Sequence, residues 1–419
     1  MTSRQEYLKR LQLVNSYEDM ADFMNEIKNI PYQFRAKAIQ FYTEKNKPYG
    51  YFMEWQIHKK HGGTRDIIMP SKPLDHILKT LLPIFEAIYA APSCVCGFVK
   101  GKSLVDNARP HVGRRFVLSM DLKDFFPSIS RTRLEDLFLN RLKLNEYVSM
   151  VFSGLCTVNK EGNQAFMPQG FCTSPVLSNM ICEDMDHDLQ ELADRHGLNY
   201  TRYADDITFS ADEDVLRENA SIALEIKEVI AKNGFTLNDK KTHLQRYGRR
   251  QHVTGVVVNK KLSLSREYIR EIRNILFIWE RYGYEDASER AYPHYLQRNG
   301  KTRGHGYIHL DRVLGGRLAY LKMVRGEDDP VYRKLMDKYV QLLADTKSKL
   351  KKVNNMDRYH RTMDERYQWI NQEFPGVNSY PFQHFLEDTR AGRVLRISLK
   401  IIFYAVLVFL FKYILAVFS

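Results

Sequence analysis

Three aspartates are the residues of this chain whose types and spacing could support metal-dependent chemistry. Asp205 and Asp206 are adjacent within YTRYADDITFSADE (residues 200–213), where β-prone flanks on both sides predict a hairpin. Asp121 follows the largely apolar run 116–120 and is therefore predicted to end a buried strand. Each feature alone is typical of a solvated turn or a strand cap, because aspartate side chains accept hydrogen bonds from nearby backbone N–H groups.

The prediction changes if the carboxylates of Asp121 and Asp205 converge from separate strands. Two converging carboxylates cannot both stay ionised at low cost unless a cation neutralises them. Hard divalent ions select oxygen ligands, and Mg²⁺ binds one or two carboxylates together with substrate phosphates. Two such ions about 4 Å apart can activate an attacking hydroxyl and stabilise a leaving pyrophosphate. The aspartates therefore predict a site with two Mg²⁺ ions at which a triphosphate reacts.

Short strands and short helices must position these residues. The sequence predicts a hairpin over 55–70 around a Gly-Gly turn, and a strand that enters a loop before Pro127. Apolar residues at helical spacing predict helices around 78–85, 177–192 and 223–230. From Ser265, an amphipathic helix carries one apolar stripe, made of Ile269, Ile272, Leu276 and Trp279. The chain is thus predicted to be an α+β protein.

The composition narrows the class of protein. A chain of 419 residues predicts two or three structural units, and 44% hydrophobic with 27% charged residues excludes wholesale disorder. The excess of 63 Lys+Arg over 50 Asp+Glu gives a net charge of +13, which indicates nucleic acid or anionic lipid as a partner. The five cysteines lack CxxC spacing and read as reduced thiols of a cytosolic chain, and the N-terminus lacks a secretory apolar run.

The C-terminal stretch 401–418 is apolar except for Lys412 and follows a cluster of basic residues. About eighteen helical residues span roughly 27 Å, close to the hydrocarbon thickness of a bilayer. The basic cluster would hold the preceding segment on the cytoplasmic side. Because the stretch has no polar face, we expect a membrane-spanning helix. A buried terminal helix and a partner-binding helix are the alternatives.

Motifs in a fixed order carry a family resemblance. DLKDFFPSI (121–129), MPQGFCTSP (167–175) and YADD (203–206) resemble the core motifs of reverse transcriptases. KKHGGTRDIIMPSK (59–72) resembles their fingers region, and GFTLNDKKT (234–242) resembles the segment after the catalytic hairpin. The resemblance covers roughly residues 50–330. It implies a right-hand polymerase with fingers, a palm of antiparallel sheet plus helices, and a helical thumb, to which one C-terminal transmembrane helix is added here.

Two shorter sequence motifs resemble those of retron-type enzymes. NARPH (107–111) matches an NAxxH pattern, and VTG (253–255) lies just past the catalytic core. This resemblance implies an RNA-directed DNA polymerase that primes from a 2′-hydroxyl of a cognate structured non-coding RNA. The product would be a branched RNA–DNA, made in bacterial antiphage defence. It also assigns Asn107 and His111 to nucleic-acid binding, although singly they fit a helix cap and a packed histidine.

The resemblance assigns the metal ligands and a proton donor. Asp121, Asp205 and Asp206 would hold two Mg²⁺ ions, with Asp121 and Asp205 as the direct bridges. Lys241, or its neighbour Lys240, lies where the family has a lysine near the leaving pyrophosphate, and it would act as a general acid. Phosphoryl transfer depends chiefly on such positioning and charge stabilisation.

The resemblance also assigns the deoxynucleotide site. Arg65 would bond the triphosphate, because a guanidinium binds phosphate oxygens bidentately. Phe126 matches the bulky residue under the incoming sugar, where an aromatic ring would clash with a 2′-hydroxyl; its alternative is a core phenylalanine. Gln169 and Gly170 match the pair that lies against the template and the nascent base pair, glycine permitting close approach of the backbone.

The thumb would grip the duplex through Arg266, Arg270 and Arg273, which recur at about one-turn spacing opposite the apolar stripe. An ordinary solvated helix face is the alternative. The predicted organisation is an N-terminal helical region, fingers and palm, thumb, linker with accessory helices, and transmembrane tail, at residues 1–50, 51–255, 256–350, 351–393 and 394–419.

Other functions stay open. A group II intron-like or abortive-infection reverse transcriptase, an RNA-templated RNA polymerase, and a membrane-tethered nucleic-acid binder with an inactive polymerase fold are the alternatives. The expected partners are the RNA and its DNA product, deoxynucleotides, the membrane, and an effector protein or further copies of the chain. The catalytic domain is expected in the cytoplasm, anchored to the bacterial inner membrane by residues 401–418.

Overall fold

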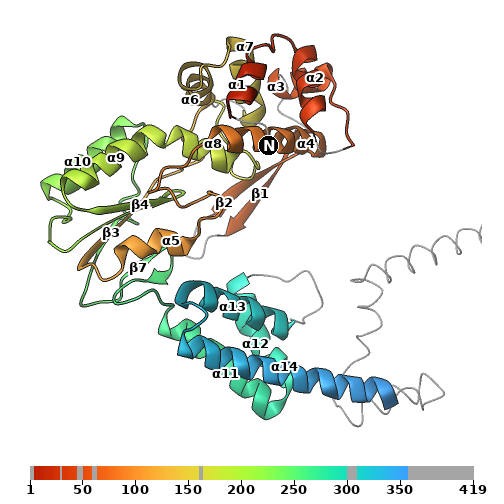
Figure 1. Ribbon diagram of the computed structural model, residues 1–419, viewed down its shortest axis with the longest axis vertical. Coiled ribbons are helices and arrows are strands. Elements are labelled where there is room, and N and C mark those ends of the chain that lie inside the picture. Colours follow the sequence, from red (N-terminus) through yellow and green to blue (C-terminus); the bar gives the residue numbers. More distant parts are fainter. Residues whose placement is uncertain are drawn as a thin grey trace, which may run out of the picture. The chain divides into compact units, whose positions relative to one another are not determined.

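A four-stranded antiparallel sheet lies at the centre of the first of two structural units, which are Met1–Ser265 and Arg266–Ser419 (Figure 1). The computed structural model describes residues 4–28, 31–44, 51–58, 64–159, 164–299 and 309–356. The sheet has the order β4-β5-β3-β6, with β3 at Phe116–Asp121, β4 at Asn199–Tyr203, β5 at Asp206–Ala211 and β6 at His243–Arg246. The α+β class is as predicted.

Helices form most of the rest of this unit. The N-terminal ones are α1 (Arg4–Leu11), α2 (Tyr17–Ile27), α3 (Ala36–Glu44) and α4 (Lys72–Ile88). The others are α5 (Leu104–Ala108), α6 (Arg131–Asp136), α7 (Glu146–Cys156), α8 (Ser174–Ile181), α9 (Glu183–Arg195) and α10 (Ser221–Lys232), with a 3₁₀ turn at Arg109–His111 and a π-helical turn at Leu137–Arg141. Ser130 caps α6 by accepting a hydrogen bond from Arg133 N.

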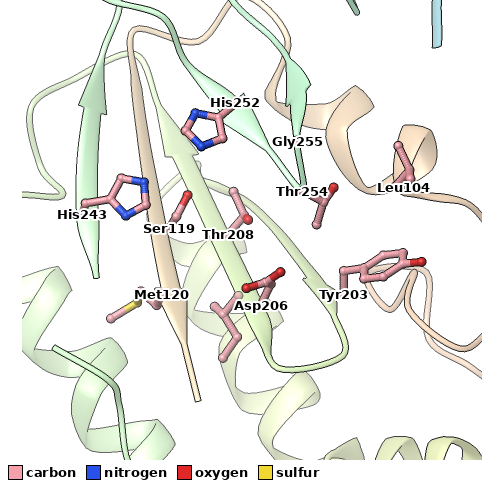
Figure 2. Close-up of a pocket in the computed structure, with 11 residues that line it drawn as sticks. Leu104, Ser119, Met120, Tyr203, Asp206, Thr208, His243, His252, Thr254 and Gly255 are labelled. Carbon is pink, nitrogen blue, oxygen red and sulfur yellow. The ribbon is translucent and has the colours of Figure 1, made fainter. Parts of the chain in front are cut away.

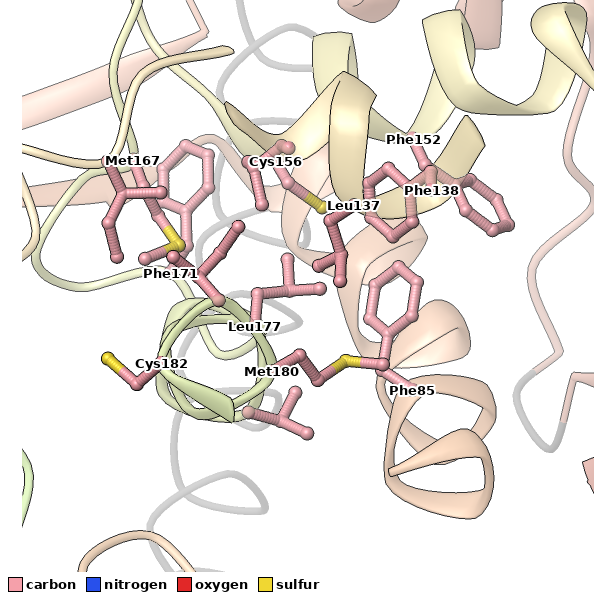
Figure 3. Packing of buried hydrophobic residues seen from close by; sticks show 14 of the residues in the cluster. Phe85, Leu137, Phe138, Phe152, Cys156, Met167, Phe171, Leu177, Met180 and Cys182 are labelled. Atoms are coloured by element: carbon pink, nitrogen blue, oxygen red, sulfur yellow. The ribbon is translucent and has the colours of Figure 1, made fainter. Parts of the chain in front are cut away.

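Aromatic packing holds these helices together. Phe85 of α4, Phe138 of the π-helical turn and Phe152 of α7 lie within 5.3–5.7 Å of one another by ring centroids. Figure 3 shows Leu177 and Met180 of α8 facing this group. Buried residues of helices α1 to α4 belong to the same continuous hydrophobic core as the sheet. The five cysteines, all among the described residues, form no disulfide bond.

The predicted fingers hairpin is present. Strands β1 (Phe52–His58) and β2 (Thr64–Pro70) pair antiparallel from Phe52↔Pro70 to His58↔Thr64, and their glycine turn lies outside the described residues. A second small hairpin joins β7 (His252–Val253) to β8 (Val256–Val257). Its turn is Thr254-Gly255, with φ of 46° and 85°, which is the sign that a two-residue type I′ turn requires.

The second unit is helical in its described part. It contains α11 (Arg266–Tyr282), α12 (Tyr284–Asn299), α13 (Leu310–Arg325) and α14 (Pro330–Met356). The predicted apolar stripe of α11 is buried in this unit, and Trp279 donates a hydrogen bond from Nε1 to Thr346 at 3.2 Å. Helix α14 continues into the first residues of the predicted linker.

Within the part of the chain that the structure describes, no helix has the length and apolarity needed to cross a bilayer. The predicted transmembrane stretch 401–418, with the rest of 357–419, lies outside the described residues.

Candidate active site

Strand register brings the three predicted carboxylates together. Asp121 is the last residue of β3 and stands directly opposite Asp206, the first residue of β5. Asp205 lies in the turn between β4 and β5, and its carbonyl accepts a hydrogen bond from Leu122 N at 3.0 Å. Directly opposed residues of antiparallel strands have Cβ atoms about 4.5–5.5 Å apart. The prediction that Asp121 meets the Asp205–Asp206 turn is therefore confirmed.

The turn that carries these carboxylates has an unusual backbone. Ala204 has φ of 58°, in the left-handed region that residues with a Cβ adopt at a cost. Gly97, from the loop before α5, packs directly against it: a Cβ at Gly97 would lie 2.3 Å from Ala204 N. Only glycine permits this contact, so the loop at residue 97 helps to fix the position of the turn that carries Asp205.

A buried ion pair also holds this turn in place. Arg202 of β4 is fully buried and donates to both carboxylate oxygens of Asp186 on α9, at 2.7 and 2.6 Å. Its Nη1 also donates to Ala204 O and to Asn179 Oδ1, each at 3.0 Å. The planar guanidinium thereby joins α8 and α9 to the turn, which fixes the turn through a network with satisfied donors. No signal in the sequence singled out Arg202, Asp186 or Asn179.

Asp121 already has a cationic partner. Lys241 Nζ lies 2.6 Å from its Oδ1, and Asn238 Nδ2 donates to Oδ2 at 3.3 Å. The lysine side chain is 57% exposed while that of Asp121 is 9% exposed, so the ammonium can move into the open space beside the carboxylates. Of the two predicted lysines, Lys241 is the one that contacts Asp121. Lys240 lines the adjacent cavity of about 340 Å³.

The carboxylates carry more negative charge than the nearby cations neutralise. Desolvation, followed by the charges of Asp205 and Asp121, raises the pKa of Asp206 to about 6. Desolvation is also the largest cause of the raised pKa of Asp205, with Asp121 adding to it, whereas Lys241 and Arg65 act in the opposite direction. Asp206 is solvent-exposed as a whole residue, so we attribute much of its shift to the neighbouring charges.

The donor set fits Mg²⁺ that arrives with a substrate. All three side chains offer hard carboxylate oxygens, and the raised pKa values of Asp205 and Asp206 show that a cation would stabilise the ionised state. Over the described ranges, no three acidic, histidine or cysteine side chains gather closely enough to hold a metal by themselves. The missing ligands fit the phosphates of a nucleotide, because Mg²⁺ commonly combines one or two carboxylates with phosphate oxygens.

The predicted nucleotide-binding residues lie on β2, in the loop after β3 and in the segment before α8. Arg65 is exposed on β2, and Phe126 is half-buried in the loop after β3. Gly170 has φ of 133°, and a Cβ there would lie 2.4 Å from Ile68 O, while Gln169 O accepts from Ile68 N at 2.8 Å. The close backbone approach that the glycine permits is thus made to strand β2, which differs from the expected approach to a base pair.

His111 corrects one expectation. Its ring is fully buried, and both nitrogens are occupied, Nδ1 by Ser210 Oγ at 2.7 Å and Nε2 by Thr201 Oγ1 at 2.8 Å. A ring held on both sides inside the palm has no atom left for nucleic acid. In this structure His111 joins the Arg109–His111 turn to strands β4 and β5, which is the packed-histidine alternative.

Asn107 links the two retron-type motifs. It is fully buried, and its Nδ2 lies 3.4 Å from Oγ1 of Thr254 in the VTG turn, while its carbonyl accepts from Thr201 at 3.2 Å. Its Oδ1 has no partner in the described part of the protein. Like His111, Asn107 does not present its side chain at the surface, and direct nucleic-acid contact by its side chain is not supported. The two motifs, far apart in sequence, form one structural element.

A cavity of about 440 Å³ opens beside Asp206 and was not anticipated from the sequence. Figure 2 shows Asp206 and Thr208 on β5 and Ser119 on β3, with His243 on one side and Thr254 on the other. The remaining lining residues are Leu104, Met120, Tyr203, Ile207, His252 and Gly255. The hydroxyl and imidazole groups around this cavity can form hydrogen bonds with the sugar and phosphate groups of a polynucleotide.

The three predicted thumb arginines are exposed on α11. Arg266, Arg270 and Arg273 lie away from the buried stripe of this helix. Their proposed role with a duplex remains a prediction.

Comparison with known proteins places this geometry in a family. A profile of the family described as Reverse transcriptase (RNA-dependent DNA polymerase) matches residues 57–263. The chain is 35% identical to the Retron Mx65 reverse transcriptase of Myxococcus xanthus over 66% of this chain and 62% of that protein. It is 34% identical to the Retron Ec86 reverse transcriptase of Escherichia coli over 50% and 63%.

The matched region thus spans less than two thirds of the length of either relative. A solved telomerase structure from Candida albicans aligns with 72% of this chain and 64% of its own, at 11% identity and a TM-score of 0.40, too weak a likeness to support an argument. Residues 57–263 therefore match the reverse transcriptase family, and the chain is similar to retron reverse transcriptases over part of their length.

Proposed function

We propose that the protein is an RNA-directed DNA polymerase that extends DNA on an RNA template. The observation that carries this proposal is the register pair Asp121↔Asp206 at the end of the sheet, with Asp205 in the adjoining turn. A polymerase needs acidic groups from two strands at one point, because the reacting triphosphate must be held with its compensating cations. An inactive fold has no use for clustered carboxylates whose pKa values are raised by burial and by one another's charges.

The residues around these carboxylates have separable roles in the proposed reaction. Arg65 would hold the triphosphate, and Phe126 would lie under the deoxyribose. Asp121, Asp205 and Asp206 would hold Mg²⁺, which when bound stabilises negative charge developing on the phosphate oxygens. Lys241 starts from its ion pair with Asp121 and is exposed enough to turn toward the leaving pyrophosphate and donate a proton.

The retron relatives support a more specific proposal. The template would be part of a cognate structured non-coding RNA, and the first deoxynucleotide would join a 2′-hydroxyl of that RNA. The product would be a branched RNA–DNA used in bacterial antiphage defence, with the RNA, the DNA product and deoxynucleotides as partners. The net charge of +13 suits a polynucleotide partner.

Copying activity tests the general proposal. Full-length protein co-purified with its own RNA is supplied with Mg²⁺ and labelled deoxynucleotides, and wild type is compared with Asp205→Asn. We expect the variant to lose at least about a hundredfold in rate, because a neutral amide replaces a metal-binding carboxylate. Asp212→Asn is the matched control: Asp212 also belongs to this hairpin region but pairs with Arg114 on the surface. Equal activity of Asp205→Asn and wild type would exclude the polymerase assignment.

Analysis of the product tests the priming proposal separately. A product that keeps one ribonucleotide after exhaustive ribonuclease treatment, and releases it to a 2′–5′ debranching enzyme, has the expected branch. A product that is fully separated from RNA by ribonuclease or alkali contradicts 2′-hydroxyl priming and leaves the polymerase assignment intact.

We also propose, from sequence alone, that residues 401–418 anchor the catalytic domain to the cytoplasmic face of the inner membrane. An effector protein or further copies of the chain would then act at that surface. Cell fractionation of the full chain against a chain ending at residue 393 measures this. Full-length protein that stays in the soluble fraction contradicts the anchor.

A further inference from the structure

Phe98 has a backbone that a large aromatic residue rarely adopts. Its φ is 60°, and its side chain is 44% exposed, in the loop that precedes α5. Single exposed apolar side chains are common on protein surfaces and need no explanation. A bulky residue held in the left-handed region is different, because it persists only where the surrounding structure forces it, and such residues gather at functional sites.

The loop around Phe98 is tied to the catalytic turn. The preceding residue, Gly97, has its Cα packed against the backbone of Ala204, and its carbonyl accepts from Asn179 Nδ2 at 2.9 Å. Cys96 N donates to Arg202 O at 2.8 Å. The position of Phe98 therefore follows the position of the hairpin that carries Asp205 and Asp206, with one residue between the close contact and the ring.

The ring of Phe98 is directed to Phe126. The two ring centroids lie 6.2 Å apart, with the planes tilted by 45°. On another side, Phe126 contacts the buried Phe125 edge-on at 5.2 Å. Aromatic pairs prefer such tilted and edge-to-face arrangements, so the two neighbours together define the orientation of the Phe126 ring. Phe125 belongs to the core, whereas Phe98 supplies the contact from the exposed side.

We propose that Phe98 is a positioning residue for sugar selection, which holds the Phe126 ring in the orientation that excludes a 2′-hydroxyl. The inference rests on the proposed polymerase function and adds a residue from outside the motifs that suggested it. The strained backbone has a role in this proposal, because a negative φ at residue 98 would direct its side chain away from the Phe126 ring. The contact also couples the sugar site to the catalytic turn through Gly97.

Single-nucleotide incorporation by the full-length chain tests the proposal. With oligo(dT) on poly(rA) as primer and template, kcat and KM are measured for dTTP and for UTP in wild type, Phe98→Ala, Phe98→Tyr, Phe126→Ala and the Phe98→Ala/Phe126→Ala double variant. We expect Phe98→Ala to raise the UTP-to-dTTP ratio of kcat/KM by about tenfold or more, since one steric contact in an apolar pocket is worth about 10- to 200-fold. The dTTP value itself should stay within about threefold.

The other variants distinguish positioning from general damage. Phe98→Tyr keeps the ring and should keep the wild-type ratio. The double variant should not exceed Phe126→Ala, because Phe98 acts through that ring and the two effects are not additive. Phe41→Ala removes another exposed phenylalanine, 50% exposed on α3, and should leave the ratio unchanged.

The outcomes separate this inference from the proposed function. If Phe126→Ala leaves the ratio unchanged, the proposed sugar site is wrong. If Phe126→Ala raises the ratio and Phe98→Ala does not, the role of Phe98 is refuted. Should Phe98→Ala fail to fold, Phe98→Leu keeps bulk without the ring; a wild-type ratio in that variant refutes the role of the aromatic contact, and a raised ratio supports it.

Discussion

The buried His111 makes the stability of the palm depend on pH in a predictable way. Desolvation, with a smaller effect of Arg114, lowers the pKa of His111 to about 3, against about 6.5 for an exposed histidine. The folded state therefore keeps the ring neutral, while the unfolded chain takes up a proton as the pH falls below 6.5. Stability from this residue is complete above pH 6.5 and is lost progressively toward pH 3.

The magnitude follows from the linkage relation. At pH 5 the unfolded chain gains RT ln(1 + 10^1.5), about 2 kcal/mol, from protonating an ordinary histidine, while the folded state gains almost nothing. In thermal unfolding, about 2 kcal/mol corresponds to roughly 4–8 °C for a unit of this size.

His111→Gln isolates this contribution. Glutamine is neutral at every pH, and its amide can both donate and accept toward Ser210 and Thr201. We expect the variant to be less stable than wild type at pH 7.5, with a difference that shrinks by about 2 kcal/mol at pH 5. Denaturation followed by circular dichroism measures the difference, and hydrogen exchange of β3 and β5 amides identifies the palm transition.

Parallel loss of stability in the two proteins would refute the reasoning, because it would mean that the folded state protonates His111 as readily as the unfolded chain. RNA affinity gives an independent check on the earlier expectation. A histidine that contacts RNA would weaken RNA binding when replaced by glutamine, at a pH where both proteins are folded, whereas a packed histidine would not.

Three further predictions concern the catalytic turn. Gly97→Ala places a Cβ 2.3 Å from Ala204 N and should reduce polymerase activity at least about tenfold at a temperature where the variant is still folded. Gly248→Ala, with open space around it, should be neutral, and comparable activities of the two variants would contradict the contact. Arg202→Met leaves the buried Asp186 without its cation and should lower the free energy of unfolding by about 3–5 kcal/mol. The double variant Arg202→Met/Asp186→Leu should recover part of this loss, and denaturant unfolding measures both. Because the pKa of Asp206 is raised to about 6, protons compete with metal below that pH, so the Mg²⁺ concentration for half-maximal activity should be about tenfold higher at pH 5 than at pH 7; a constant requirement would mean that Asp206 is not a ligand.

The meeting of the three aspartates could be predicted because local patterns specify both strands. Apolar residues define β3 and β5, and a two-residue turn joins β5 to β4 in a hairpin. Acidic residues at the ends of adjacent strands then lie close together. The buried apolar stripe of α11 could also be predicted, since helical periodicity indicates which face of a helix is buried.

The supports of the site could not be predicted, because they depend on which residues are buried together. Arg202 occupies a position that reads as polar and exposed, yet it is fully buried against Asp186 from the preceding helix. Asn107 and Thr254 are 147 residues apart and meet only in the fold. His111 shows the same limit in reverse: a motif can mark a family while its histidine acts in packing rather than in binding.

Backbone strain gathers around the candidate site. Among the described residues, the non-glycine residues with positive φ are Phe98, Asp124, Lys143, Ala204 and Thr254. Ala204 directly precedes Asp205, Thr254 lines the cavity beside Asp206, and Phe98 contacts Phe126. Conformations of this kind cost on the order of 1–3 kcal/mol each and persist only where surrounding contacts determine them.

Those contacts are visible for each part of the site. Gly97 and Arg202 hold the turn at Ala204, Asn107 contacts the turn at Thr254, and Ser128 N donates to the carbonyl of Asp124 at 2.8 Å. Stability of the palm is therefore used to keep a strained geometry in place before substrate arrives, which avoids reorganisation during the reaction. It follows that a substitution which displaces one of these supports should shift the turn and reduce activity at temperatures where the protein is still folded.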